Sequence, residues 1–180
     1  LTSDISRDEL CLFIIPSFTA LHEASQRVDH HLIKLGAQNM FWEDKGPWTG
    51  EISPIMLREM EIDIVEIGHS ERRQWFGETD FTVNRKVLAG LRHNLITLIC
   101  IGETMQDKTL GINVERLRQQ VKIALHGVSE DRLHNVWIAY EPVWAIGESG
   151  TPATPEYASS MHGVLRQVLM ELYPKQAASI

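Results

Sequence analysis

Short apolar runs alternate with amphipathic segments along the whole chain. Five runs of five to seven residues are rich in Ile, Val, Leu or Phe, and they cover residues 11–16, 32–38, 62–68, 95–101 and 136–140. Each run is too short for a buried helix, and unbroken apolar character is typical of a parallel strand that is covered on both faces. The sequence therefore predicts five buried parallel strands.

Helical patterns separate these runs. Apolar residues recur at helical spacing in residues 53–60, 83–93, 114–125 and 154–172. Asn113 is expected to cap the third helix, and Thr154 caps the fourth, where Pro155 occupies the first helical position. Strand–helix alternation predicts a single α/β domain over residues 1–180 with a parallel sheet, either open and doubly wound or closed into a barrel. Periodicity leaves both forms open.

Composition narrows the class of protein. The 180 residues carry a formal net charge of −7, and 43% of them are hydrophobic, as in an ordinary globular domain. No apolar run approaches the roughly 18 residues of a membrane span, and the acidic balance argues against nucleic-acid binding. Cys11 and Cys100 both lie in apolar runs, so we expect two buried free thiols and a reducing, cytoplasmic compartment.

Polar residues that could perform chemistry follow two of the predicted strands. Glu141 comes directly after the run 136–140, and a carboxylate at the end of a dry strand can act as a general base toward a carbon acid. His69 precedes Ser70, where a helical turn could begin; amide N–H groups that point at the imidazole would keep it neutral and able to polarise a carbonyl. Taken singly, a histidine such as His69 is more often a hydrogen-bonded structural residue, and a glutamate such as Glu141 is more often a helix cap or an ion-pair partner.

Several longer motifs remove most of this ambiguity. The stretches GHSERRQWFGETD (residues 68–80) and AYEPVWAIG (139–147) resemble the two signatures of triosephosphate isomerases. Shorter stretches match that family in the same order: GAQN at 36–39, WTGEISP at 48–54 and ICIGE at 99–103. The resemblance covers the whole chain and implies a (β/α)8 barrel, of which these residues would form roughly strands two to six.

The resemblance also implies a reaction and a set of site residues. Glu141 would be the base and neutral His69 the electrophile in the isomerisation of a small phosphorylated sugar, with no metal and no cofactor. Gly147 would bind the substrate phosphate from a closing lid over residues 142–150, while Asn39 and Glu71 would be supporting groups.

The segment 39–51 is also expected to make an interface. Its apolar residues Met40, Phe41, Trp42 and Trp48 are too apolar for a solvated loop. The resemblance places Thr49 and Trp48 on a loop that enters a neighbouring subunit, and it implies a homodimer.

Three departures from the family pattern qualify these expectations. The family's first strand and its last two βα units have no counterpart between Leu1 and Ile180, so we expect a piece of a longer chain. The lid reads IGESGTPAT (146–154), and it and the Trp-containing loop are similar to a sub-branch that isomerises tetrulose phosphates such as erythrulose phosphate. The alternatives are therefore a tetrulose-phosphate isomerase, a non-catalytic member that binds a phosphorylated ligand, and an unrelated open α/β binding protein.

Overall fold

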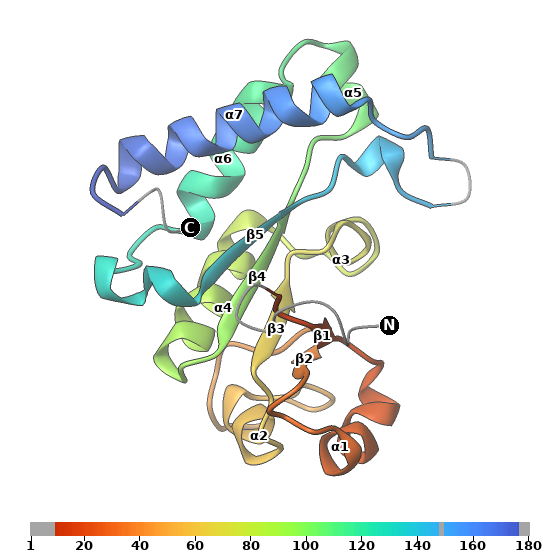
Figure 1. The fold of residues 1–180 in the computed structure, drawn as a ribbon, viewed down its shortest axis with the longest axis vertical. Coiled ribbons are helices and arrows are strands. Elements are labelled where there is room, and N and C mark those ends of the chain that lie inside the picture. Colours follow the sequence, from red (N-terminus) through yellow and green to blue (C-terminus); the bar gives the residue numbers. More distant parts are fainter. Residues whose placement is uncertain (1–9, 148–149, 177–180) are drawn as a thin grey trace.

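The computed structural model describes residues 10–147 and 150–176, and its centre is a parallel sheet. The strands lie in chain order, so that each pairs with the next one along the sequence (Figure 1). They are β1 (Phe13–Ile14), β2 (Lys34–Ala37), β3 (Ile64–Ile67), β4 (Ile96–Ile101) and β5 (Val136–Tyr140). The five predicted strands are therefore confirmed, although β1, β2 and β3 are shorter than the apolar runs that contain them.

The order of the strands decides between the two sheet types that periodicity left open. A doubly wound sheet reverses its strand order at a switch point, where its ligand binds. Here the order runs from β1 to β5 without a reversal, as in one arc of a barrel. The strand ends that follow β3, β4 and β5 therefore share one edge of a curved sheet.

Helices follow the strands and form an outer layer. They are α1 (Phe18–Arg27), α2 (Pro54–Glu59), α3 (Ser70–Trp75), α4 (Asp80–Arg92), α5 (Met105–Thr109), α6 (Asn113–Ala124) and α7 (Pro155–Leu172), together with the 3-10 turns η1 (Glu130–Asn135) and η2 (Val143–Ala145). All four predicted helices are present with ends shifted by at most three residues. Within the described residues, no helix has both the length and the apolar character needed to cross a membrane.

The two faces of the sheet differ in burial. Strand register places Val65 of β3, Thr97 of β4 and Val136 of β5 on the same face, and each is at most 1% exposed because helices cover it. The opposite, inner face carries Leu98 and Trp137, which are only partly buried. The expectation of strands buried on both faces is therefore correct for the outer face and wrong for much of the inner one.

The first strand shows the largest difference from expectation. Phe13 and Ile14 are 41% and 43% exposed, and Cys11 is an exposed free thiol, whereas Cys100 is buried as expected. The physical reason is position: β1 is at the edge of the sheet and pairs only with β2. Apolar composition predicted a strand correctly but could not predict which strand lies at an edge.

One predicted cap is also wrong. The residue at the cap position of α6 is Ile112, and Asn113 is the first residue of the helix. The Asn113 side chain instead donates a hydrogen bond of 3.3 Å to the Tyr157 hydroxyl of α7. By contrast, Thr154 caps α7 as predicted, because its hydroxyl accepts the Tyr157 N–H.

Candidate active site

The first turn of α3 holds both expected catalytic side chains. His69 ends the β3 segment and caps α3, where its Nδ1 accepts the Glu71 N–H at 3.3 Å. Glu141 follows β5, and its Oε1 accepts the Ser70 N–H at 2.8 Å. His69 and Glu141 are far apart in the sequence, yet consecutive backbone N–H groups of one short helix position them together.

The two side chains meet directly. His69 Nε2 lies 3.3 Å from Glu141 Oε2, and the side chains are 25% and 18% exposed. Because Nδ1 accepts a hydrogen bond from the backbone, the ring proton of the neutral imidazole lies on Nε2, which points at the carboxylate. A hydrogen-bond donor, His69 Nε2–H, therefore lies beside a carboxylate at the partly open edge of the sheet.

Burial strengthens Glu141 as a base. Removal of the carboxylate from water raises the pKa of Glu141, because the charged form loses solvation. The Ser70 N–H and His69 act in the opposite direction, since both stabilise the carboxylate. The net effect is a raised pKa of Glu141, which makes its carboxylate a stronger base toward a carbon-bound proton.

Glycine is required at the bend that presents His69. Gly68 has a φ of 80°, in the left-handed region that side-chain-bearing residues rarely adopt. A Cβ there would also lie 2.9 Å from the Arg73 guanidinium and 3.1 Å from the Cys100 carbonyl. Arg73 Nε donates to the Gly68 carbonyl at 2.7 Å, which fixes the bend against α3.

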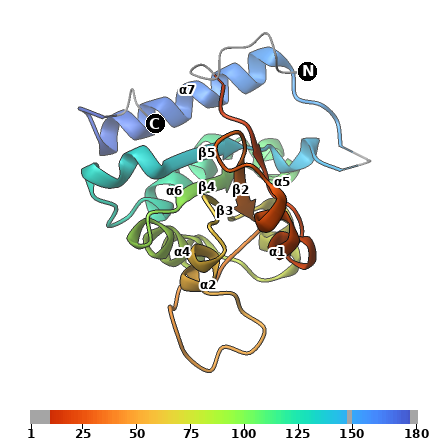
Figure 2. The same ribbon diagram turned by 60° about the horizontal axis from the view of Figure 1, so that its bottom comes forward.

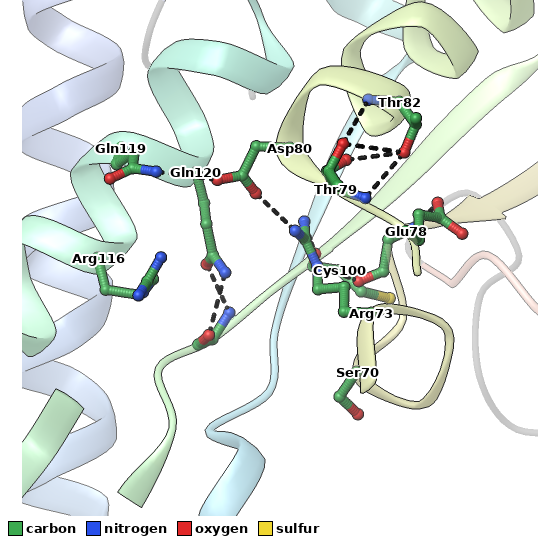
Figure 3. A network of polar contacts seen from close by, with 12 residues as sticks. Ser70, Arg73, Glu78, Thr79, Asp80, Thr82, Cys100, Arg116, Gln119 and Gln120 are labelled. Carbon is green, nitrogen blue, oxygen red and sulfur yellow. Dashed lines mark hydrogen bonds and ion pairs between the residues drawn. The ribbon is translucent and has the colours of Figure 1, made fainter. Parts of the chain in front are cut away.

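A second glycine fixes the backbone of Glu141. Gly102 follows β4, and a Cβ on it would lie 1.9 Å from the Glu141 carbonyl oxygen. The side chain of Gln120, 5% exposed on α6, bonds to both backbone groups of Gly102 at 2.9 and 3.2 Å (Figure 3). The ends of β4 and β5 therefore lie in close contact beside the Glu141 backbone.

Asn39 lies in a buried ionic network rather than beside the catalytic pair. Its side-chain oxygen accepts a hydrogen bond of 2.7 Å from Lys86 Nζ, and Lys86 in turn lies 3.1 Å from Glu78. Glu78 also accepts the Arg72 Nε–H at 2.8 Å and the Gly68 N–H at 3.1 Å. Asn39 is therefore linked to the bend before His69 through two residues that sequence reasoning missed.

One signal could have revealed this network. Lys86 lies on the buried stripe of α4 with Val83, Val87 and Gly90, and a lysine in such a stripe requires a partner. Burial lowers the pKa of Lys86, and the Glu78 carboxylate counteracts that effect. Glu71, the other expected supporting residue, contributes mainly through its backbone: its carboxylate is 72% exposed and lies 3.7 Å from His69 Nδ1.

A buried carboxylate anchors the start of the expected lid. Glu103 is fully buried and accepts hydrogen bonds from the side chains of Tyr140, Trp144 and Tyr157 at 2.8 to 3.1 Å. Its backbone carbonyl accepts the Val143 N–H at 3.0 Å. The motif at residues 99–103 contains Glu103, but its structural role could not be predicted, because its three partners lie on three other elements.

Gly147 lies in the described part of the expected lid. It is exposed and has a φ of 83°, and its carbonyl accepts the Gly150 N–H. Glu148 and Ser149 lie outside the described residues.

The loop that carries Trp48 and Thr49 projects from the body of the protein (Figure 2). Trp48 is 46% exposed and packs on Phe41, whose ring centre is 5.0 Å away, and Phe41 stacks on Trp42. Met40 is 1% exposed and belongs to the core of this chain, so its expected exposure in the loop is wrong.

A cavity of about 440 Å³ lies behind Ser70. Four of its charged lining residues form ion pairs: Arg73 pairs with Asp80 (Figure 3) and Arg116 pairs with Asp107, while the fifth, Glu78, pairs with Arg72 and Lys86 outside the lining. Among residues 10–147 and 150–176, no cluster of His, Cys, Asp or Glu side chains could hold a metal ion.

Comparison with known proteins agrees with this geometry. The model of the triosephosphate isomerase family matches residues 2–180. The chain belongs to the triosephosphate isomerase family. Its five parallel strands are accordingly part of a (β/α)8 barrel, as the motifs predicted.

Named relatives within the triosephosphate isomerase family fall into two groups. The chain is 52% identical over 168 residues to the L-erythrulose-1-phosphate isomerase of Rhizobium etli, a match that covers 92% of this chain and 63% of the relative. It is 54% identical over 149 residues to the enzyme of that name from Rhizobium rhizogenes, covering 82% and 57%. It is 49% identical over 167 residues to the triosephosphate isomerase of Thermoanaerobacter pseudethanolicus, covering 93% and 67%. The chain thus spans about three fifths of the length of the erythrulose-phosphate relatives.

Proposed function

We propose that the protein is an aldose–ketose isomerase that acts on a small phosphorylated sugar. The observation that supports this proposal most directly is the 3.3 Å contact between His69 Nε2 and Glu141 Oε2. The hydrogen bond from the Glu71 N–H to His69 Nδ1 leaves the ring proton of the neutral imidazole on Nε2. Bound substrate would replace this direct contact, with its carbon acid at Glu141 and its carbonyl oxygen at the His69 Nε2–H.

The reaction follows from these roles. Glu141 removes a proton from the carbon beside the carbonyl, and the carbonyl π bond shifts to give an enediolate. The His69 Nε2–H stabilises the developing oxyanion by a hydrogen bond, without the delay of solvent reorganisation. The proton of the neighbouring hydroxyl passes to the former carbonyl oxygen, and Glu141 returns the abstracted proton to the neighbouring carbon, so that aldose and ketose interconvert with no net redox change.

Two substrate classes follow from the relatives. Triose phosphate and L-erythrulose 1-phosphate are both candidates, and the names of the Rhizobium relatives support the four-carbon substrate. One added carbon in a pocket changes discrimination by only about 1–3 kcal/mol, so activity on both is expected. Parallel measurements of kcat/KM on dihydroxyacetone phosphate and L-erythrulose 1-phosphate test the preference, and a strong triose preference would refute the four-carbon assignment.

The catalytic assignment is tested by Glu141→Gln. This change keeps the size of the side chain but removes the base, so turnover should fall by at least about 10²-fold. Near-normal turnover of the folded variant would remove Glu141 from the mechanism. It would also favour the alternative of a non-catalytic, ligand-binding member of the family.

We further propose that two copies associate through the projecting loop, with Thr49 near its tip. Exposed aromatic side chains support this proposal: Trp48 on the loop, and Trp75, Phe76 and Phe81 around the end of α3 and the start of α4, with 46–71% exposure. Trp48→Asp should convert a dimer to a monomer in light scattering, whereas Leu110→Asp, at another exposed apolar position, should not. Equal masses for the two variants would contradict the loop interface.

The remaining proposals concern ligands and location. Gly147 is proposed to donate its N–H to the substrate phosphate from the lid. The reaction needs no cofactor or metal ion, since hydrogen bonds carry the developing charge. The two free cysteines support a reducing, cytoplasmic compartment.

A further inference from the structure

A carboxylate that the proposed mechanism does not use lies on the inner face of the sheet. Glu66 is on β3 between Val65 and Ile67, which are fully buried against the helices, so its own side chain points to the opposite face. Register places it beside Leu98 of β4, which in turn pairs with Trp137 of β5. An ionisable group in such an apolar layer costs free energy, which makes a functional role worth testing.

Cys100 connects Glu66 to the catalytic site. Its thiol donates to Glu66 Oε1 at 3.9 Å, and the residue is 2% exposed. Burial raises the pKa of the Cys100 thiol, and the negative charges of Glu141 and Glu66 raise it further. The thiol therefore lies in the electrostatic field of both carboxylates, one nearer the strand ends and one deeper in the sheet.

The charged and polar groups around Glu141 act in two directions. Ser70 N–H, His69 and Arg73 stabilise its ionised form, whereas burial and Glu66 disfavour that form. Glu66 itself has a raised pKa, first because of burial, while His69 and the Cys100 thiol oppose the rise and Glu71 adds to it.

A lysine on the same face is too far away to neutralise Glu66. Gly36 of β2 lies opposite Ile64, so continuing the register places Gln38 opposite Glu66. Lys34 is four residues before Gln38, about 13 Å along the strand at the usual rise per residue. Lys34 therefore does not neutralise the Glu66 carboxylate.

We propose that Glu66 is a positioning residue of the isomerase: its carboxylate, on the inner face of β3 below the His69–Glu141 pair, strengthens Glu141 as a base. The inference rests on the proposed function. Two nearby carboxylates resist simultaneous ionisation, so Glu141 holds an abstracted proton more firmly when Glu66 is charged. A stronger base removes a proton from a carbon acid faster while it remains ionised at the working pH.

Glu66→Gln tests this role, because it keeps the shape and removes the charge. The acidic limb of the kcat/KM profile, measured on L-erythrulose 1-phosphate and dihydroxyacetone phosphate, should move to lower pH by about 0.5–1 unit. Turnover on the plateau should fall about threefold, since Glu141 becomes a weaker base. Glu66→Asp keeps the charge and should restore most of both properties.

Matched variants control for charge and folding. Glu59→Gln removes an equal charge from an exposed position on α2 and should leave the limb unmoved. Glu66→Leu suits the apolar layer and should shift the acidic limb by as much as Glu66→Gln does. If one of these two neutral variants fails to fold, the other still provides the test. The proposal would be overturned if the acidic limb of the kcat/KM profile lay at the same pH in the neutral Glu66 variants as in Glu59→Gln.

A titration without substrate separates this inference from the proposed function. The pKa of Glu141 is followed by ¹³C NMR of glutamate-labelled protein, with the signal assigned through Glu141→Gln. A lower Glu141 pKa in Glu66→Gln supports the coupling, and an unchanged pKa refutes it. If wild-type protein lacked turnover on both sugars while Glu66→Gln still lowered the Glu141 pKa, the isomerase function would be refuted and the coupling would stand.

Discussion

Replacement of Gly102 by alanine should disable catalysis without touching a catalytic side chain. The added Cβ would lie 1.9 Å from the Glu141 carbonyl oxygen and 2.7 Å from its carbonyl carbon, whereas ordinary contact begins at 3.4 Å. Both atoms belong to the backbone, so no side-chain rotation can relieve the clash. The end of β5 must move by about 1.5 Å, and a displacement of about 1 Å in a reacting group can cost about 10²-fold in rate.

The assay compares turnover and stability in the same variant. Turnover of Gly102→Ala on either sugar phosphate should fall by about 10²-fold, because Glu141 no longer faces His69 in register. The free energy of unfolding in urea should fall by about 1–3 kcal/mol, as is usual when a packed site is overfilled.

A glycine in open space provides the matched control. Gly163 lies in α7, and a Cβ on it would meet nothing within 4 Å. Gly163→Ala should therefore keep full turnover and add about 0.5–1 kcal/mol of stability, since alanine favours the helix. If Gly102→Ala turned over substrate like Gly163→Ala, the contact between the β4 and β5 ends would not position the catalytic base.

Two further predictions concern buried charges. Lys86→Met removes one of the two cationic partners of the Glu78 carboxylate, which keeps Arg72, so the free energy of unfolding in urea should fall by about 1–3 kcal/mol. The control is Lys122, which forms an exposed pair with Glu171, so Lys122→Met should lower the free energy of unfolding by about 0.5 kcal/mol or less. Equal losses in the two variants would contradict a stabilising role of the buried network. Burial opposes ionisation of Asp107, but hydrogen bonds from Thr104 and Arg116 outweigh it and lower the Asp107 pKa below 3.8. The ionised Asp107 side chain therefore stabilises the fold fully above its unfolded-state pKa, and this stabilisation is lost as the pH falls through the lowered, folded-state pKa. In Arg116→Met the loss should begin at a higher pH in acid-unfolding curves. Superimposable curves of the variant and the wild type would refute this.

Local patterns predicted the secondary structure well. The helix over residues 154–172 was readable because Thr154, Pro155 and the apolar stripe all act within a few residues of one another. The helices α1 and α5 were not predicted: α1 buries only Leu21 and so lacks an apolar stripe, and the five residues of α5 offer too little length for a periodic signal. The cap of α6 was misplaced by one residue because Asn113 has a partner on a distant helix, and that contact is invisible to local reasoning.

The candidate site was predictable only in part. His69 and Glu141 were found through long motifs, since neither residue taken alone distinguished a catalytic group from a structural one. The geometry that brings them together includes the Ser70–Glu141 hydrogen bond, which joins residues 71 positions apart. The role of Gly102 is hidden in the same way, because the backbone that a Cβ on it would strike belongs to Glu141, which follows the next strand.

The amino-acid sequence by itself determined the alternation of strands and helices, the parallel sheet and the chemistry present at the strand ends. Those properties depend on periodicity and on residue type, which are local. The tertiary structure alone decided that β1 is an exposed edge, that Met40 belongs to the core and that Lys86 completes a buried network with Asn39 and Glu78. Burial and ion pairing depend on which distant segments meet, because the free energy of a buried charge is set by its neighbours in space and not by its neighbours in the chain.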